Sequence, residues 1–463
     1  MKKLLLINPV GRRSGMLLSR FTLFPPLGLA YVAGATPPDW NVKILDENFE
    51  RFQFEEADLV GITSFTATVN RAYEIARIYR DRKIKVIMGG VHASMAPEEA
   101  LRYVDAVVIG EVENIWGQVL RDFEENCLSQ RYEGPKVDLS VPGIRPRRDL
   151  LHPNYVWDSI QTSRGCPFNC DFCSVSRYLG KEYRKRDVDD VLDELASMKN
   201  DYPIFFLDDN LIGHTKQEKF ASEELFAGMI KNKLNKKWIM QTTINGADDE
   251  RLVEIAANAG WTTAFIGFET IDESTLRGMK KYINLRAGIE SYSKAVKTFH
   301  KYQIGVVGLF VIGNDDEPAS YYEHLADFMI RSGIDAFQVT ILTPLPGTAL
   351  MERIVAENRL ACTDFPKDWD KFRLSYVVIR PRGTTAEIIY EGDNHIKNRL
   401  YSFPTFQRRM LRSLFSLRNA HSFYAVYKFN KGLRRSWQSS HYYKKRLSVL
   451  SRYRFYGPGP ERG

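Results

Sequence analysis

Short apolar runs alternate with helical patterns from the first residue to about residue 133. Five runs are almost continuously apolar, as strands buried on both faces are, and they read "KLLLINP", "VKILDEN", "LVGITSFT", "KVIMGG" and "AVVIGE". Helical stretches fall between most of them, for example residues 69–81, "VNRAYEIARIYRD". Buried parallel strands joined by helices predict a doubly wound, Rossmann-like α/β domain.

A second alternation begins at Ser159. Its predicted strands read "SIQTSRG", "PIFFLDDN", "WIMQTTIN", "TAFIGFET", "GVVGLFVIGN" and "DAFQVTILTPLPG". Helical segments separate them, including "VDDVLDELASM" and "YSKAVKTFHKY". Six βα units predict an open or partial TIM-type barrel rather than a complete eight-stranded one. In both kinds of sheet, ligands bind at the carboxyl ends of the strands.

The pattern divides the chain into consecutive regions. Residues 1–133 form the first α/β domain and residues 159–380 the partial barrel. Between them, residues 134–158 carry four prolines and little periodicity, which predicts a linker. The strand pattern stops at about residue 381, so residues 381–463 are expected to be a basic, aromatic, helical C-terminal region.

Charge is distributed unevenly over the 463 residues. The net charge is +8, but residues 401–463 hold fourteen Lys and Arg against one acid, a net +13, so the other 400 residues sum to 8 − 13 = −5. Fourteen aromatic residues are interleaved with those basic residues. Such a composition suits the interface of an anionic membrane or a single nucleic-acid strand. A helical cap packed on the barrel is the third interpretation, and nucleic acid is the least favoured of the three.

Five cysteines, three of them clustered, do not make a disulfide framework. This usage is typical of a reducing compartment. The apolar run at the start is broken by Asn8 and Pro9, and it is too short for a signal peptide core. No stretch approaches the roughly 18 apolar residues of a spanning helix. We therefore expect a cytoplasmic protein, with the inner membrane face as a possible site of peripheral attachment.

Cys166, Cys170 and Cys173 have the spacing C-x3-C-x2-C directly after a predicted strand. Soft thiolates suit iron, and three of them on one loop can hold three corners of an iron–sulfur cube while one iron stays open. Cys127 and Cys362 stand far away in unlike surroundings. Structural zinc is the weaker alternative, since it generally takes four ligands in paired spacings and would need His152 as the fourth.

This motif, with the aromatic Phe172 before the last cysteine, resembles the signature of radical S-adenosylmethionine (SAM) enzymes. The resemblance covers roughly residues 159–355 and implies a [4Fe–4S] cluster on the three cysteines, with SAM on the open iron. Further SAM contacts are implied, on the matching strand ends, at Phe172, Asp208, Asp209, Gly267, Glu269, Gly308 and Gly313. Close packing is the alternative role for the glycines, and capping of the next helix for the two aspartates.

The first domain lacks a G-x-G-x-x-G after any strand, which speaks against a dinucleotide. Its segments "FPPLGLAYVAG", "VGITSFT", "MGGVHASMAPEEA" and "VIGEVENIW" are similar to the cobalamin-binding domain of B12-dependent radical SAM proteins. The resemblance implies cobalamin contacts at Thr63, Ser64, Gly89, Gly90, His92, Gly110 and Glu111. The loop after the first strand reads "NPVGRRSG", without the D-x-H-x-x-G of cobalt-ligating domains, so no protein histidine is expected below cobalt. A degenerate domain without cobalamin is the alternative.

Together the two resemblances imply a cobalamin-dependent radical SAM C-methyltransferase. A 5′-deoxyadenosyl radical would activate an unactivated carbon and methylcobalamin would supply the methyl group, so the cofactors carry the difficult chemistry and no catalytic acid–base pair is predicted. The substrate would be a small molecule or a lipid, and the electron donor a flavodoxin or ferredoxin. Tyr178, Tyr183, Arg184 and Lys185 are candidates to frame the cavity. A B12 radical SAM cyclase or rearrangement enzyme is the runner-up, followed by a tRNA-modifying enzyme and a non-catalytic cobalamin or redox sensor.

Overall fold

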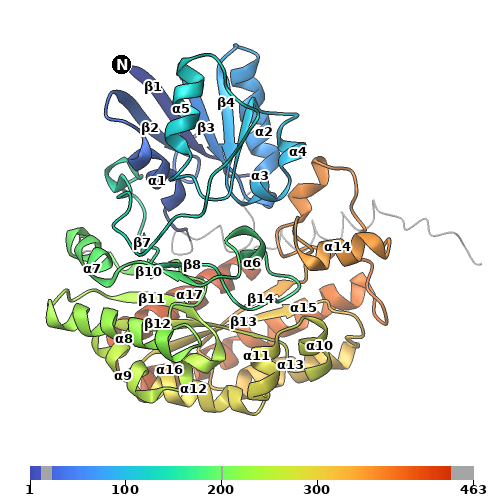
Figure 1. Cartoon of the computed structure of the whole chain (residues 1–463). Coiled ribbons are helices and arrows are strands. Elements are labelled where there is room, and N and C mark those ends of the chain that lie inside the picture. The colour runs from blue at the N-terminus through green and yellow to red at the C-terminus, as the bar shows by residue number, and fades with distance from the viewer. Residues whose placement is uncertain (12–22, 200–201, 439–463) are drawn as a thin grey trace, which may run out of the picture.

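Two six-stranded parallel sheets organise the chain, one after the other (Figure 1). The structure is a computed structural model and describes residues 1–11, 23–199 and 202–438. The first sheet has the order β2-β1-β3-β4-β5-β6. Its strands are β1 (Lys2–Asn8), β2 (Trp40–Asp46), β3 (Leu59–Thr63), β4 (Lys85–Gly89), β5 (Ala106–Ile109) and β6 (Arg131–Glu133). The predicted doubly wound domain is confirmed, and the short edge strand β6 is an addition.

Side chains of β1 alternate between the two faces of the first sheet. Leu4 and Leu6 pack with helices α1 (Leu27–Ala35) and α5 (Trp116–Glu124). Leu5 and Ile7 point the other way. They pack with helices on the opposite face, namely α2 (Val69–Arg80) and α3 (Val91–Met95). Both faces are therefore covered, and the edge formed by the carboxyl ends of the strands is the part of this sheet that can meet a ligand.

Segment 134–157 contributes no strand to either sheet. The second sheet follows with its strands in plain chain order, all parallel. They are β7 (Asp158–Ile160), β10 (Ile204–Phe206), β11 (Trp238–Thr242), β12 (Trp261–Glu269), β13 (Gly305–Ile312) and β14 (Ala336–Ile341). Because the strands follow chain order, the helices that connect them lie on one face of the sheet. The sheet curves away from these helices and forms the expected partial barrel.

The predicted strand "SIQTSRG" is interrupted in the structure. Only β7 joins the sheet, whereas β8 (Ser163–Arg164) pairs antiparallel with β9 (Arg184–Lys185) in a separate hairpin. The buried carboxylate of Asp208 accepts hydrogen bonds from the backbone and hydroxyl of Thr162 and from the Ser163 hydroxyl. These bonds hold the chain at the point where it leaves the sheet, so β8 leads into the cysteine loop above the barrel.

Helices cover the outer face of the second sheet and bury a large apolar core against it. They include α7 (Val188–Ser197), α8 (Lys216–Lys231), α9 (Glu250–Asn258), α12 (Ser291–Lys301) and α13 (Ala319–Arg331). After β14 come α14 (Ala349–Ala356), α15 (Ala386–Tyr401), α16 (Phe403–Leu417) and α17 (Ala420–Gln438). The prediction of a helical C-terminal region is confirmed for the described residues, while 439–463 lie outside them.

The last helix fills the concave inner face of the partial barrel (Figure 1). Phe429 of α17 packs with inward-facing strand residues such as Ile239, Phe265 and Val307. The partners on β11, β13 and β14 belong to the amino-terminal halves of their strands, so α17 fills that half of the barrel and leaves the carboxyl ends facing the first domain. Buried Arg409 of α16 ties the two helices to the barrel, since it donates to Asp335 O at 2.8 Å and to Asn430 Oδ1 at 3.0 Å. No helix within the described ranges is long and apolar enough to span a membrane.

Candidate functional site between the two sheets

The three clustered cysteines lie on the loop between β8 and helix α6 (Val175–Tyr178), and all are half-buried. Gly165 opens the loop with a φ of +88°, and a Cβ there would stand 2.0 Å from the Glu182 carbonyl oxygen, so only glycine fits. Backbone bonds shape the rest of the loop. Cys166 N donates to Gly180 O at 3.2 Å, and Cys173 N donates to Cys170 O at 3.3 Å. The loop is therefore fixed by its backbone.

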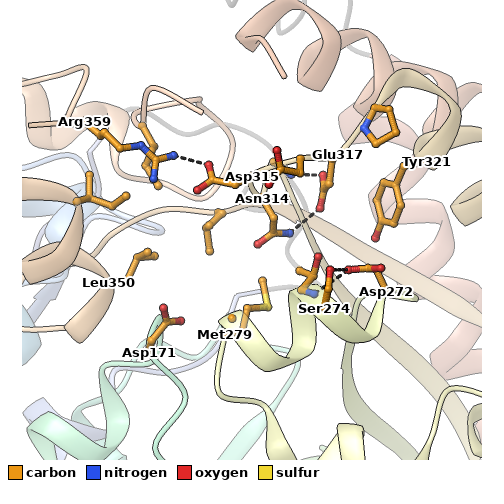
Figure 2. A pocket seen from close by; sticks show the side chains of 18 of the residues that line it. Asp171, Asp272, Ser274, Met279, Asn314, Asp315, Glu317, Tyr321, Leu350 and Arg359 are labelled. Carbon is orange, nitrogen blue, oxygen red and sulfur yellow. Dashed lines mark hydrogen bonds and ion pairs between the residues drawn. The ribbon is translucent and has the colours of Figure 1, made fainter. Parts of the chain in front are cut away.

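Asp171 holds this loop in place through three contacts. Its backbone N donates to Met279 O at 3.1 Å, its carbonyl accepts from Leu350 N at 2.8 Å, and its carboxylate pairs with Arg353 at 2.6 Å. A cavity of about 420 Å³ lies beside it (Figure 2). Gly313, one of the predicted SAM contacts, lines the same cavity. The end of β13 and the cysteine loop are thus brought to one place.

Burial dominates the electrostatics of the thiols. It raises the pKa of Cys166 to about 11 and that of Cys173 to about 12, and it raises the pKa of Cys170 as well, while the charge of Lys281 acts in the opposite direction on all three. Buried thiols become thiolates when a metal neutralises them. Within the described residues, no three His, Cys, Asp or Glu side chains converge where one metal ion could sit. A cube-shaped cluster takes its ligands at separate irons, so this finding concerns single-ion sites only.

A buried ion pair faces the thiols from the end of β12. Lys281 Nζ lies 2.7 Å from Glu269 Oε1. Glu269 has a φ of +64°, and the register of β12 against β13 shifts between Gly267 and Glu269. Such a backbone is uncommon for a non-glycine residue and aims the carboxylate at Lys281. Burial lowers the pKa of Lys281, but the charge of Glu269, its hydrogen bond and the charges of Cys170 and Cys173 together outweigh burial, so the net pKa is raised and the ammonium stays charged.

The neighbouring aspartates Asp208 and Asp209 differ in their surroundings. Asp208 is fully buried and bonded to Thr162 and Ser163. Among the described residues, the carboxylate of Asp209 pairs with no other side chain, and its own backbone N–H is its hydrogen-bond donor. Burial, followed by the charge of Asp208, raises the pKa of Asp209 to about 7. Its charge raises the pKa of Cys166 and Cys173, so the carboxylate lies near the cysteine loop.

The remaining predicted SAM contacts fall into two groups. Gly267 touches the ion pair, since a Cβ there would lie 2.4 Å from Glu269 Oε1 and 3.1 Å from Lys281 Nζ. Gly313 N donates to Glu317 Oε2 at 2.7 Å, which fixes the turn after β13. Gly308 is closely packed by Phe268, Phe310 and Ile334, and Phe172 packs on the apolar cluster that joins the first domain to the segment after the barrel; a SAM contact of either residue stays a prediction.

Small residues form the edge of the first sheet that faces the barrel. Thr63, Gly89 and Gly110 stand at or just past the ends of β3, β4 and β5. Gly90 has a φ of +91°, and a Cβ there would lie 2.7 Å from Thr63 Oγ1. Ser64 is buried beside Met88. This edge leaves little room for larger side chains, and a flat ligand could approach its backbone closely.

His92 is completely buried. Its Nδ1 lies 3.2 Å from Thr66 Oγ1 and its Nε2 lies 3.3 Å from Glu99 Oε1. Trp369, from the segment after the barrel, donates to the same Glu99 carboxylate at 2.9 Å. Both ring nitrogens of His92 therefore have protein partners. A direct cobalamin contact of His92 stays a prediction, and the geometry gives the residue a place in a buried network.

Ion pairs join the first sheet to the cysteine loop. Arg164, two residues before Cys166, pairs with Glu111 at 3.0 Å and with Glu113 at 2.5 Å. Arg184 also pairs with Glu111, and Tyr178 OH donates to Gly110 O at 3.4 Å. Burial alone would raise the pKa of Glu111, but these arginines and a backbone N–H hold it below its ordinary value. The edge of the first sheet and the cysteine loop thus form one connected site.

Two of the residues predicted to frame a cavity are engaged elsewhere. Tyr183 OH donates to Asn210 O at 2.8 Å, and Lys185 Nζ donates to Ser222 Oγ at 2.5 Å. Burial lowers the pKa of Lys185 to about 8. Tyr178 and Arg184, in contrast, lie where the two sheets meet.

Comparison with known proteins identifies both halves of this site. Residues 13–120 match the B12 binding domain, and residues 160–329 match the radical SAM superfamily. The chain is also 30% identical over 407 residues to an uncharacterized methyltransferase of Pyrococcus horikoshii, which covers 80% of this chain and 86% of that protein. The chain is a cobalamin-dependent radical SAM methyltransferase.

Two further relatives extend this result. Bacteriochlorophyllide d C-12(1)-methyltransferase of Chlorobaculum tepidum is 27% identical over 423 residues, covering 88% of this chain and 89% of the relative. The radical SAM methyltransferase TsrM from Kitasatospora setae, solved with cobalamin and a [4Fe–4S] cluster bound, has a TM-score of 0.64 at 18% identity, over 77% of this chain and 78% of that one. At that identity the likeness shows the shared fold.

The residues of this radical SAM methyltransferase fit its cofactors, namely a [4Fe–4S] cluster, SAM and cobalamin. Three free thiols on a backbone-fixed loop suit the cluster, and the carboxylate of Asp209, which pairs with no other side chain among the described residues, lies near them. Sequence reasoning missed Lys281, because it comes twelve residues after Glu269 on the far side of another helix. A lysine closely following the "GFET" segment is the only signal that the sequence offers for it.

Proposed function

We propose that this enzyme transfers a methyl group to an unactivated carbon of a small, largely apolar molecule. The observation that carries the proposal is the set of ion pairs from Glu111 and Glu113 to Arg164, two residues before Cys166. These pairs hold the edge of the first sheet, where cobalamin would bind, against the cysteine loop. A reaction that uses both cofactors on one substrate needs them to be held close together in this way. When bound, the cluster and cobalamin supply reductive SAM cleavage and the methyl carrier, and the protein supplies position and exclusion of water.

Residue roles for SAM follow from charge. The amino acid end of SAM carries one ammonium and one carboxylate. Glu269 and Lys281 offer the complementary pair at the end of β12, and Asp209 offers a second carboxylate that no protein group occupies. We assign Asp208 a structural role, because its oxygens hold Thr162 and Ser163. Gly313 and the turn after β13 form the neighbouring wall.

Residue roles for cobalamin follow from size. Thr63, Gly89 and Gly110 leave the first sheet's edge open to the flat corrin and its nucleotide tail. Exposed Phe65, directly after Ser64, adds an apolar surface at the same edge, with 65% of its area open. We assign Glu111 to the link with Arg164 and Arg184 rather than to the cofactor, because its carboxylate is already paired.

Partners of this enzyme would include a one-electron donor, such as a flavodoxin or ferredoxin, and the surface of an anionic membrane reached through residues 401–463. The substrate class is supported by the relative that is named for methylating bacteriochlorophyllide d. A lipid is the other apolar class that fits the basic, aromatic C-terminal region.

Incubation of the reduced holoenzyme with trideuteromethyl-SAM and an apolar extract tests this function. The expected result is 5′-deoxyadenosine together with an apolar product that carries one deuterated methyl group, and none from a Cys170→Ala control. 5′-Deoxyadenosine formed with a rearranged but unmethylated product would contradict methyl transfer.

A further inference from the structure

Helix α16 exposes an unusual apolar face. Phe403 is 64% exposed, Leu411 55%, Leu414 46% and Phe415 73%. Its opposite side is anchored in the protein through Arg409, Met410, Ser413 and Leu417. Single exposed apolar residues are ordinary, but four large ones on one helix of fifteen residues form a patch that usually meets a partner or a membrane.

The segment that carries this face has positive charge and no acid of its own. Residues 402–438 contain eight Lys or Arg and no Asp or Glu. Arg409 and Arg412 serve inside the fold, where Arg412 donates to Ile330 O at 2.9 Å. Arg408 on α16 and Arg418 directly after its end are exposed. Helix α12, which packs against α16, adds three lysines, of which Lys301 pairs with Glu250, whereas another neighbour, α15, carries acidic residues as well.

We propose that the face formed by Phe403, Leu411, Leu414 and Phe415 docks on an anionic lipid bilayer. The inference rests on the proposed peripheral membrane association and assigns it to one helix. Aromatic and leucine side chains would enter the boundary between headgroups and acyl chains, and Arg408 and Arg418 would contact anionic headgroups. The bilayer is the partner that matches an apolar stripe flanked by exposed arginines on a segment without acids.

The position of α16 leaves the reaction site free. Figure 1 places α16 on the side of the barrel away from the first domain. It packs on α12, α15 and α17. Docking through α16 would therefore hold the enzyme at a membrane surface while the carboxyl ends of both sheets stay open to substrate and reductant.

Co-sedimentation of the full-length holoenzyme with vesicles tests the docking face. Phosphatidylcholine vesicles containing phosphatidylglycerol are compared with phosphatidylcholine alone at low salt. The enzyme should bind the anionic vesicles, and Leu411→Ser/Leu414→Ser/Phe415→Ser should lower partitioning by on the order of tenfold or more, because apolar burial is lost. A matched control, Phe220→Ser/Ile230→Ser, changes exposed apolar residues of α8 and should sediment like the wild type.

Two outcomes would overturn the assignment: a wild type that ignores anionic vesicles, and a triple α16 variant that binds them undiminished. Lys444→Gln/Lys445→Gln/Arg446→Gln tests the competing surface in residues 439–463. Loss of binding in that variant, with binding kept in the α16 variant, would move the site to the C-terminal segment. Iron content and 5′-deoxyadenosine formation, measured without vesicles in the same samples, report separately on the proposed function.

Discussion

The two sheets of this molecule are alike in size and direction, yet they present ligands differently. The first sheet reverses its order between β1 and β3 and is covered by helices on both faces. The second keeps chain order, curls, and takes helices outside and α17 inside. Both sheets are therefore closed along their faces and open at the carboxyl ends of their strands. Because those two open ends meet through Glu111 and Arg164, two separate folds build one site.

Loss of the cluster ligands should separate the two halves of the site most sharply. Replacing Cys166, Cys170 or Cys173 with Ala should remove the cluster and abolish SAM cleavage, because three thiolates hold the three ligated irons. Cobalamin binding by the first sheet should persist. Iron analysis and 5′-deoxyadenosine assays measure this, with Cys127→Ala as the control. A cluster lost in that control would contradict the ligand set.

Loss of the packing of α17 inside the barrel should lower the stability of the second sheet only. Phe429→Ala leaves a cavity against the inward-facing strand residues and should cost about 3–5 kcal/mol of unfolding free energy. Tyr424→Ala changes an exposed ring on the same helix and should cost about 0.5 kcal/mol or less. Denaturant unfolding of the two variants gives the comparison. Equal costs would show that α17 does not plug the barrel.

Removal of the ion pairs of Glu111 tests whether the contact between the two sheets contributes to stability. Glu111→Gln removes the carboxylate charge that Arg184 pairs with and leaves Arg164 with Glu113 alone, so it should cost about 3 kcal/mol. Because folding lowers the pKa of Glu111 below its ordinary 4.5, its contribution is complete above that pH and is lost as the pH falls through the lower folded pKa. The variant should lack this acid-dependent part of the unfolding free energy. The exposed pair of Asp149 provides the control, and Asp149→Asn should change little.

Lys281→Met should produce the smallest change. It removes the positive partner of Glu269 but leaves the cysteines, so the cluster should form while SAM affinity falls by about tenfold, the loss of one charge-assisted contact. Lys281→Arg should restore most of that affinity. Equilibrium binding of SAM to reconstituted protein measures both, and a normal affinity in the Met variant would exclude Lys281 from the SAM site.

Much of this architecture could be predicted from the sequence, because apolar runs of strand length report burial directly. Both sheets, the partial barrel and the helical C-terminal region were accessible in this way. The hairpin β8–β9 was not, since the strand pattern runs unbroken through "SIQTSRG" and only the tertiary bonds of Asp208 interrupt it.

Pairing between distant residues also escaped sequence reasoning. Glu111 reads as a ligand contact from its place after β5, whereas its arginine partners come 53 and 73 residues later. The composition of the basic C-terminal region likewise left open a surface or a cap on the barrel, and only the fold shows that Arg409 and Phe429 are buried inside the barrel assembly. A charge or an aromatic residue does not reveal its partner until the fold brings the two together.

Electron spin relaxation in the doubly loaded enzyme tests the central claim, that both sheets' open ends form one site. Cob(II)alamin should relax faster when the [4Fe–4S] cluster is reduced than when it is oxidised, because the two paramagnets would lie within reach of each other. The same measurement on the Cys170→Ala variant, which lacks the cluster, should show no change with reductant. A cob(II)alamin signal whose relaxation is indifferent to a reduced cluster in the wild type would contradict the claim.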